Sequence, residues 1–504
     1  MSESPSPSSP ETRTALPLKG KMVSGSIWMI AMRWTMRFLG ILNVGILARL
    51  LEQEDFGLVA MASAVMALPV MLLNLGVEQA VIRERGASPE FINTAWTLRA
   101  LQMTFVSVLI YVSAPWVADY YNDARMVDIF HALAAMSFLA GLENIWTITF
   151  RTEFRFHKDF LYNTIVKILG VVITVALAIY LRSYWALVYG QILGSLAQLV
   201  VSFFVAPKRP RPTLREWRKI WSFSQWSLLN GIAQYVVQQV DRLILGRVGA
   251  AALVGTYMLG RELAELPMQE ISGPVNRALG PGFAELQHEP ERFAAAFLKT
   301  VGALAAVSLP VALGISTTAT ELVPLVLGPG WENAVSVTRI LAFAGVFITM
   351  QSLFSNTLMV IGYVRFAAAA SWLRAGMLIA IAIPASLAWG MEGMAYAMVI
   401  AGASGLSLNI WALCRKMPSL GLVAMLGAVL RPVIATVAMV LAVWLWRFSG
   451  IELDIALLAC KTATGVVVYS GVLLLLWRQA GGPDGIESMI LDGARLFLRR
   501  AAAR

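Results

Sequence analysis

Charged residues are scarce in this chain of 504 residues: Asp, Glu, Lys and Arg make up 14% of it, against 58% hydrophobic residues. Soluble globular domains carry about 25% charged residues, so the composition excludes an ordinary soluble protein. The net charge is +10, but the basic residues lie between apolar runs or inside them. Because nucleic-acid binding needs basic residues gathered on a soluble face, we expect no nucleic-acid partner.

Cysteine and histidine are also rare, with two and three residues. Cys414 and Cys460 stand within or at the ends of apolar runs without a CxxC pattern, which excludes a disulfide framework and a zinc site. His131, His157 and His288 lie too far apart in sequence to indicate a ligand cluster. No Walker A motif is present, so the chain does not hydrolyse ATP by that route. We therefore expect neither a metal nor a cofactor.

Long apolar runs make up most of the chain. Each has the roughly 20 residues that a transmembrane helix needs. They cover residues 23–48, 57–80, 92–116, 126–149, 160–181, 184–206, 221–248, 250–276, 293–318, 333–361, 366–389, 393–414, 422–446 and 454–477. The expected fold is an all-α integral membrane protein with about 14 transmembrane helices.

The distribution of basic residues supports this count, since a missed helix would invert every later loop. Loops assigned to the cytoplasm hold 24 of the 40 Lys and Arg residues, and the opposite side holds five. Cytoplasmic loops are enriched in Lys and Arg. The pattern predicts a multi-pass protein with both termini in the cytoplasm.

A repeated element divides the chain. Residues 49–69 read RLLEQEDFGLVAMASAVMALP and residues 247–267 read RVGAAALVGTYMLGRELAELP, with Arg, Gly and Pro at matching positions. Helices 1–6 and 7–12 are therefore predicted to be parallel repeats, although a chance match is the alternative. Gly57 and Gly255 are expected to permit tight turns, and the two prolines to kink their helices.

The expected domains follow from this division. They are a disordered N-terminus 1–21, a first six-helix lobe 22–206, a basic cytoplasmic linker 207–219, a second lobe 220–416, two further helices 417–478 and a cytoplasmic amphipathic tail 479–504.

Basic residues inside predicted helices are the candidates for function, because each costs about 2.5–3.5 kcal/mol at the centre of a membrane helix. The alternative is snorkelling, in which a side chain near a helix end reaches the headgroups. Snorkelling is expected for Lys299, Arg339, Arg242, Lys461 and Arg431. The candidates for substrate binding are Arg33, Arg37 and Arg261, followed by Arg99, Lys167 and Arg374.

Polar stripes run along two helices of the second repeat. They comprise Ser227, Asn230, Gln234, Gln238 and Asp241 in one helix and Arg261, Glu265, Ser272 and Asn276 in the next. Such stripes cannot face lipid without a large penalty, so they line a wet cavity or pair helices through internal hydrogen bonds. Cations outnumber acids inside the helices, which favours an anionic cargo. The candidates for coupling or gating are Asp241, Glu262, Glu265, Gln234 and Gln238.

The stretch SGSIWMIAMRWTMRFLGILNVGILARLLEQEDFGLVAMASAVMALPVMLLNLGVEQAVIRE resembles the opening of Wzx-type polysaccharide flippases of the colanic acid and exopolysaccharide branch. The elements RLL-x-x-x-DFG-L and LGV-x-x-A are the most specific parts, and FRFHKDF and VQQVDRLILGR are also similar. The resemblance covers roughly residues 22–415 and places the chain in the multidrug/oligosaccharidyl-lipid/polysaccharide exporter superfamily.

This resemblance implies two lobes in a V around a central cavity, in the bacterial inner membrane. It implies transport of an undecaprenyl-pyrophosphate-linked oligosaccharide by alternating access, with polysaccharide polymerase and export proteins as partners. Arginines on helices 1 and 8 of similar flippases are functional, which points to Arg33, Arg37 and Arg261. The alternatives are a cation-coupled multidrug antiporter of the same superfamily, or an enzyme or non-transporting component of a polysaccharide assembly complex.

Overall fold

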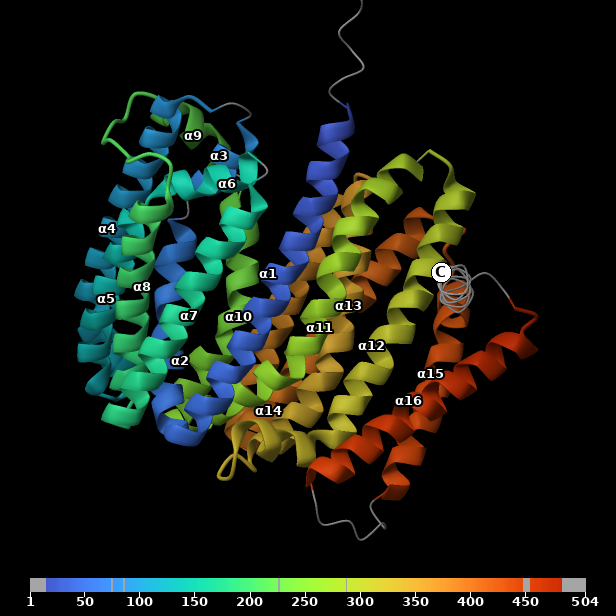
Figure 1. Cartoon of the computed structure of the whole chain (residues 1–504). Helices are drawn as coiled ribbons and strands as arrows, with labels where there is room; N and C mark the ends of the chain where they lie inside the picture. The colour runs from blue at the N-terminus through green and yellow to red at the C-terminus, as the bar shows by residue number, and fades with distance from the viewer. Residues whose placement is uncertain are drawn as a thin grey trace, which may run out of the picture. The chain divides into compact units, whose positions relative to one another are not determined.

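The computed structural model describes residues 15–73, 76–84, 87–153, 155–224, 227–286, 288–446 and 454–482. Within these ranges the chain is helical and contains no strand (Figure 1). The elements are α1 Ala15–Leu50, α2 Gln53–Leu72, α3 Val77–Arg83, α4 Pro89–Tyr121, α5 Arg125–Leu142, the 3-10 turn η1 Ile145–Ile148, α6 Thr149–Thr152, α7 Phe156–Leu181, α8 Trp185–Val205, α9 Trp217–Ser224, α10 Ser227–Val248, α11 Ala251–Leu286, α12 Pro290–Leu327, α13 Ala334–Val360, α14 Val364–Lys416, α15 Leu422–Leu445 and α16 Asp454–Gln479.

Eleven helices of the described residues are long and apolar enough to cross a membrane. They are α1, α2, α4, α5, α7, α8 and α12 to α16. The chain is therefore a multi-pass membrane protein. Helices α10 and α11 are not among these eleven. The number fourteen stays a prediction.

Helix α14 turns back on itself at the predicted boundary between residues 389 and 393. Trp389 and Gly390 leave helical geometry there, and Gly390 has φ 56° and ψ −133°, a conformation that a side chain disfavours. A β-carbon on Gly393 would lie 1.9 Å from the carbonyl oxygen of Ala385. Glycine at these two positions thus permits two successive helices to meet closely.

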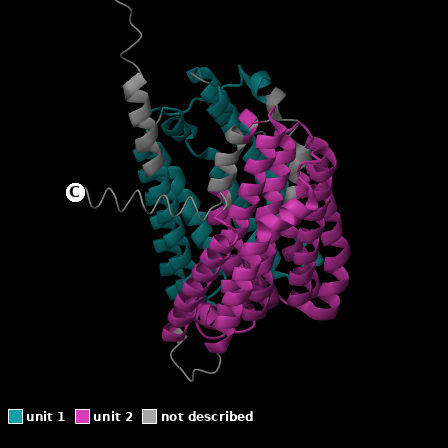
Figure 2. Ribbon diagram, turned by 90° about the vertical axis from the view of Figure 1, so that its right-hand side faces the viewer, with its two compact units in different colours: residues 1–51, 65–231 teal, residues 52–64, 232–504 magenta. Residues whose placement is uncertain are grey.

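The described chain divides into two compact units, coloured separately in Figure 2. Unit 1 comprises residues 1–51 and 65–231. In it α4 packs on α5, α7 on α8, α1 on α7 and α5 on α8. A buried cluster of α3, α4, η1 and α9 closes one end, formed around Val81, Phe91, Ile145 and Ile220.

Unit 2 comprises residues 52–64 and 232–504. Helix α13 packs against α11, α12 and α14, while α15 and α16 pack on α12 and on each other. Its core centres on aromatic residues, and Phe297 contacts Phe354 edge to face at 5.1 Å. Helices α15 and α16, which lie outside the predicted repeat, are therefore attached through α12.

The repeated glycines do not form turns, so that part of the prediction is wrong. Gly57 lies inside α2 and Gly255 inside α11. A β-carbon on Gly57 would lie 1.7 Å from the carbonyl oxygen of Ala251, and one on Gly255 would lie 1.9 Å from that of Gln53. Both residues belong to unit 2, and the glycines allow the two helix starts to cross with their backbones in contact.

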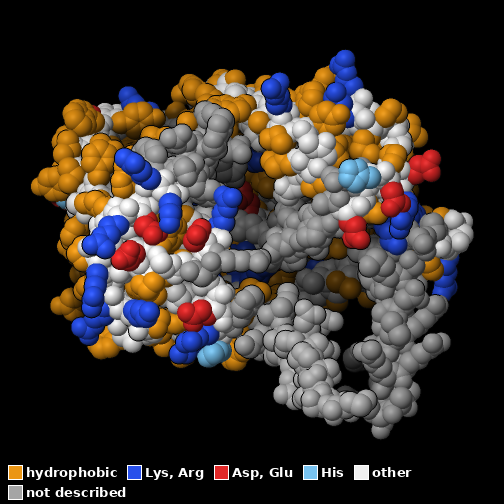
Figure 3. Space-filling view, turned by 90° about the horizontal axis from the view of Figure 1, so that it is seen from above, with side chains coloured by type: hydrophobic (Ala, Val, Ile, Leu, Met, Phe, Trp, Pro, Cys, Tyr) orange, Lys and Arg blue, Asp and Glu red, His pale blue; other side chains and the backbone are white. Residues whose placement is uncertain are grey.

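One expected helix boundary also differs from the structure. The run 57–80 is interrupted, since α2 ends at Leu72 and a separate helix α3 begins at Val77. The linker 207–219 is fastened to the start of α4: the Thr213 amide donates to Thr97 Oγ1 at 2.9 Å, and Arg215 pairs with Glu90 at 3.2 Å. Figure 3 shows Lys and Arg side chains gathered on this end of the molecule, with hydrophobic side chains around the rim.

Several predictions lie outside the described residues. They concern residues 1–14, the amphipathic tail from 483 onward, and the side chains of Ser227, Asn230, Gln234, Ser272 and Asn276.

Candidate functional site

Arg261 of α11 is the centre of a buried ionic cluster in unit 2. Its Nε donates to Glu265 Oε1 at 2.7 Å, one turn along the same helix, and its Nη1 donates to Asp241 Oδ2 of α10 at 2.5 Å. Asp241 is fully buried and Arg261 is 9% exposed. Buried charges persist only when they are paired and hydrogen-bonded, and this guanidinium meets that requirement for two carboxylates at once.

Arg374 of α14 belongs to the same region of charge. It lies within electrostatic range of Arg261 and Glu265, and its Nη1 donates to Gln351 Oε1 at 3.5 Å. Its Nε is buried and has no hydrogen-bond partner among the described residues. Gly405 makes room for this contact, because a β-carbon there would lie 2.7 Å from Gln351 Nε2. The structure thus brings together two predicted binding cations, Arg261 and Arg374, and two predicted coupling acids, Asp241 and Glu265.

Two other predicted coupling residues, Gln238 and Glu262, lie on α10 and α11, the helices that carry this cluster. The Gln238 carbonyl oxygen accepts a hydrogen bond from Arg261 Nη1 at 3.4 Å, while its side chain is exposed. Glu262 is half-buried on α11 and has an interaction of its own. Neither residue is part of the Arg261 ion pairs.

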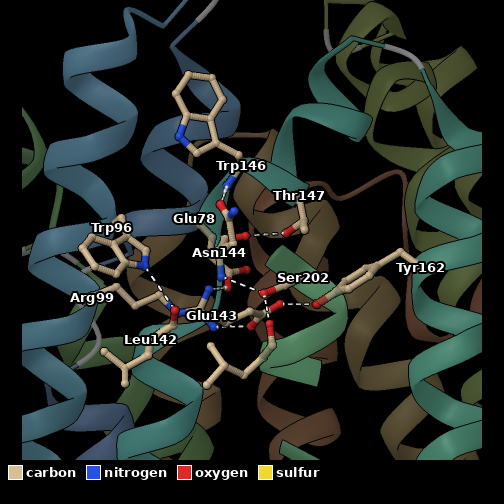
Figure 4. A network of polar contacts seen from close by, with 11 residues as sticks. Glu78, Trp96, Arg99, Leu142, Glu143, Asn144, Trp146, Thr147, Tyr162 and Ser202 are labelled. Atoms are coloured by element: carbon tan, nitrogen blue, oxygen red, sulfur yellow. Dashed lines mark hydrogen bonds and ion pairs between the residues drawn. The ribbon is translucent and has the colours of Figure 1, made fainter. Parts of the chain in front are cut away.

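Arg99 of α4 lies in a separate polar network in unit 1, drawn in Figure 4. Its Nη2 donates to Glu143 Oε2 at 2.7 Å, and its Nη1 lies 3.4 Å from Glu78 Oε1. The Tyr162 hydroxyl of α7 donates to Glu143 Oε1 at 2.6 Å. Arg99 and Glu143 together therefore join α3, α4 and α7 at the end of α5.

The network continues through Asn144 to the linker. The Asn144 backbone amide donates to Ser202 Oγ of α8 at 3.0 Å, and its side chain donates to the Lys208 carbonyl oxygen at 2.9 Å (Figure 4 shows the Ser202 bond). Arg99 was predicted to contact substrate, but its bonds in the described residues fasten helices together. Tyr162 and Ser202 were not anticipated, because an isolated hydroxyl in an apolar run gives no sequence signal.

The remaining predicted cations lie in unit 1. Arg33 and Arg37 are half-buried on α1, one turn apart, and each has an interaction of its own. Lys167 of α7 lines an open cavity of about 470 Å³. The structure therefore does not bring Lys167 into the ion-paired network of Arg99.

Lys461 does not snorkel, so that prediction is wrong. Its Nζ lies 2.6 Å from Glu321 Oε1 of α12, and the two residues are 9% and 7% exposed. Glu321 was missed because the helix was expected to end at residue 318, whereas α12 continues to Leu327. A buried pair needs a close partner to offset desolvation, and the pair attaches α16 to α12.

A protein family described as polysaccharide biosynthesis proteins matches residues 46–336. Two curated relatives are similar over much of the chain. The lipopolysaccharide biosynthesis protein WzxC of Escherichia coli is 22% identical over 346 residues, covering 68% of this chain and 70% of that protein. The succinoglycan biosynthesis transport protein ExoT of Rhizobium meliloti is 24% identical over 474 residues, covering 91% and 93%.

The fold is similar to that of a solved flippase structure. The lipid II flippase MurJ, in an inward closed conformation, superposes with a TM-score of 0.73 over 90% of this chain and 99% of that one. The sequence identity is 13%, so this comparison concerns the fold alone.

Proposed function

Since the chain belongs to the family of polysaccharide biosynthesis proteins, we propose that it flips undecaprenyl-pyrophosphate-linked repeat units across the inner membrane for exopolysaccharide or lipopolysaccharide synthesis. It is a transporter of the flippase type and not an enzyme. Relatives named for the biosynthesis or transport of extracellular polymers match up to 91% of its length. Its membrane helices share the fold of a lipid-linked saccharide flippase.

The observation that carries the proposal, beyond the family, is the set of cations held among membrane helices. Arg261 and Arg374 interact electrostatically in unit 2, and Arg33, Arg37 and Lys167 lie on α1 and α7. A charged side chain inside a membrane is costly and by default functional. Such cations suit phosphate and carboxylate groups, whereas an organic cation, the cargo of a multidrug antiporter, would need acidic or aromatic walls.

We propose that transport proceeds by alternating access, with Arg33, Arg37 and Arg261 holding the pyrophosphate. Arg99 and Arg374 would add positive charge. An anion approaching Arg261 competes with Asp241 and Glu265 for the same guanidinium. Carboxylates released in this way gain affinity for a proton or sodium ion, because an adjacent cation no longer stabilises their charge.

The coupling role proposed for Asp241 and Glu265 follows from this exchange, and Gln234 and Gln238 lie on the same stripe as Asp241. Glu262 is proposed as a third coupling acid. The membrane potential is an additional drive of about 2.3 kcal/mol per charge per 100 mV. We further propose that both termini lie in the cytoplasm and that the polymerase and export proteins receive the product.

A deletion strain tests the proposal. It should accumulate lipid-linked oligosaccharide on the cytoplasmic face of the inner membrane, and the plasmid-borne wild-type chain should restore export. Export of normal polymer from the deletion strain would contradict the flippase assignment. Triple substitution of Arg33, Arg37 and Arg261 by Ala with wild-type export would contradict the cationic site.

A further inference from the structure

The cavity at Lys167 lies wholly within unit 1. Four helices contribute to it: α1, α5, α7 and α8. Its volume of about 470 Å³ is in the range of small-molecule sites, about 300–1,000 Å³. Its lining residues include Asn43, Lys167, Thr174, Gln191, Ser195 and Gln198. The cavity thus combines amides, hydroxyls and one cation with an apolar wall that includes Leu47, Met136 and Leu187.

Glycines keep the cavity open. Gly170, Gly190 and Gly194 all line it. A β-carbon on Gly170 would meet no atom within 4 Å, so this position borders open space. A β-carbon on Gly190 would lie 2.5 Å from Thr174 Oγ1, so Gly190 is needed where α7 and α8 touch.

Polar groups in this cavity have unused bonding capacity. The Oδ1 atom of Asn43 is buried and has no hydrogen-bond partner among the described residues. Among the described residues, Lys167 also forms no ion pair with a carboxylate. Buried polar atoms are normally hydrogen-bonded, and an unpaired one indicates a missing partner. A buried acceptor and a cation without a carboxylate partner, on two residues that line one cavity, indicate a ligand that supplies both a donor and an anion.

Sugars offer this combination. Ring hydroxyls donate and accept, which suits Asn43 and Gln191, and a carboxylate on the sugar suits the ammonium of Lys167. A pyrophosphate suits the cavity less well, because Lys167 is the single cation among its lining residues and no guanidinium fork is present.

We infer that this cavity is a subsite for a carboxylate-bearing sugar residue, a hexuronic acid, of the transported repeat unit, with Lys167 pairing with the carboxylate. The inference rests on the proposed flippase function and names its substrate class. It separates the sugar, bound in unit 1 at Lys167, from the pyrophosphate assigned to the arginines.

The subsite is connected to the rest of unit 1. The Gln198 side chain lines the cavity and lies near the Tyr162 hydroxyl, which donates to Glu143. A sugar that engages the Gln198 amide would therefore lie beside Tyr162. Binding in the cavity would therefore affect the hydrogen-bond network of Glu143, which joins α4 to the linker.

The test uses the full-length protein in lipid nanodiscs, with binding measured by saturation-transfer NMR. The probes are sodium glucuronate, glucose and inorganic pyrophosphate. Glucuronate should bind and pyrophosphate should not displace it. Lys167→Met should weaken glucuronate binding roughly tenfold, the loss expected for a charged hydrogen bond, while leaving glucose binding unchanged. Lys167→Arg should restore most of the difference.

Gly170→Leu fills the cavity and should abolish binding of both sugars. Gly427→Leu is the matched control, since Gly427 is an exposed position on α15 whose β-carbon also meets no atom within 4 Å. Size-exclusion profiles of both variants verify folding. Absence of glucuronate binding to the wild type, full binding to Gly170→Leu, equal loss of both sugars in Lys167→Met, or displacement by pyrophosphate would each overturn the inference.

Failure of the subsite is distinguishable from failure of the flippase function. If the wild-type chain restores export in the deletion strain but does not bind glucuronate, the subsite alone is wrong. If it fails to restore export, the proposed function is wrong, whatever the binding result.

Discussion

Replacing Arg261 by Ala should destabilise the protein as well as impair export. The substitution removes the guanidinium that bonds to Asp241 at 2.5 Å and to Glu265 at 2.7 Å. Asp241 is fully buried, so its carboxylate would lose its cation without gaining water. The helices α10 and α11, which this cluster joins, would then carry two uncompensated negative charges.

The magnitude follows from the burial of the pair. Breaking a buried ion pair by removing one partner costs about 3–5 kcal/mol, a large part of the roughly 5–15 kcal/mol by which folded proteins are stable. Neutralising the acids as well, with Asp241→Asn and Glu265→Gln, should recover part of this loss. Directly contacting residues couple by about 0.5–3 kcal/mol.

Membrane abundance and thermal melting of the solubilised protein, followed by fluorescence-detected size exclusion, measure the effect. Arg261→Ala should lower both, and the triple variant should raise them again. Arg242→Ala is the matched control, because Arg242 lies on α10 and hydrogen-bonds Gln239 at 2.9 Å without pairing with an acid in the described residues. If Arg261→Ala keeps wild-type abundance and melting while export is lost, the structural role argued for this arginine is refuted.

Gly57→Ala should lower abundance sharply because its β-carbon would lie 1.7 Å from the Ala251 carbonyl oxygen, whereas Gly40→Ala, with no atom within 4 Å, should be neutral or stabilising by up to about 1 kcal/mol. The melting curves of the two variants test this difference, and equal curves would contradict the close crossing of α2 and α11. Tyr162→Phe should lower the free energy of unfolding by about 1.5–3 kcal/mol, the value of a hydrogen bond to a carboxylate, and thermal melting measures this loss. An unchanged melting curve would show that the 2.6 Å bond to Glu143 does not stabilise the protein. Labelling of cysteines introduced at positions 211 and 123 should place Arg211 and Asp123 on opposite sides of the membrane. The two residues lie near opposite ends of α4, whose 33 residues span about 50 Å. Labelling of both positions from the same side would contradict this topology.

The sequence alone determined the class of protein. Apolar runs, the distribution of loop cations and the DFG-containing element predicted a multi-pass polysaccharide flippase, and the membrane helices and the family match confirm that reading. The membrane helices can be predicted from sequence because membrane insertion depends on the summed hydrophobicity of about 20 neighbouring residues. The break near Gly390 was also locally encoded, by a glycine with positive φ.

Only the tertiary structure decided which groups are partners. Arg99 pairs with Glu143, 44 positions away, and Lys461 with Glu321, 140 positions away. Helical periodicity states which face of a helix a charge occupies but not which helix packs against that face. The paired glycines illustrate the limit, since their repetition was visible in sequence while their role became clear when α2 and α11 were seen to cross. Partner choice depends on packing between segments far apart in the chain, which no local pattern records.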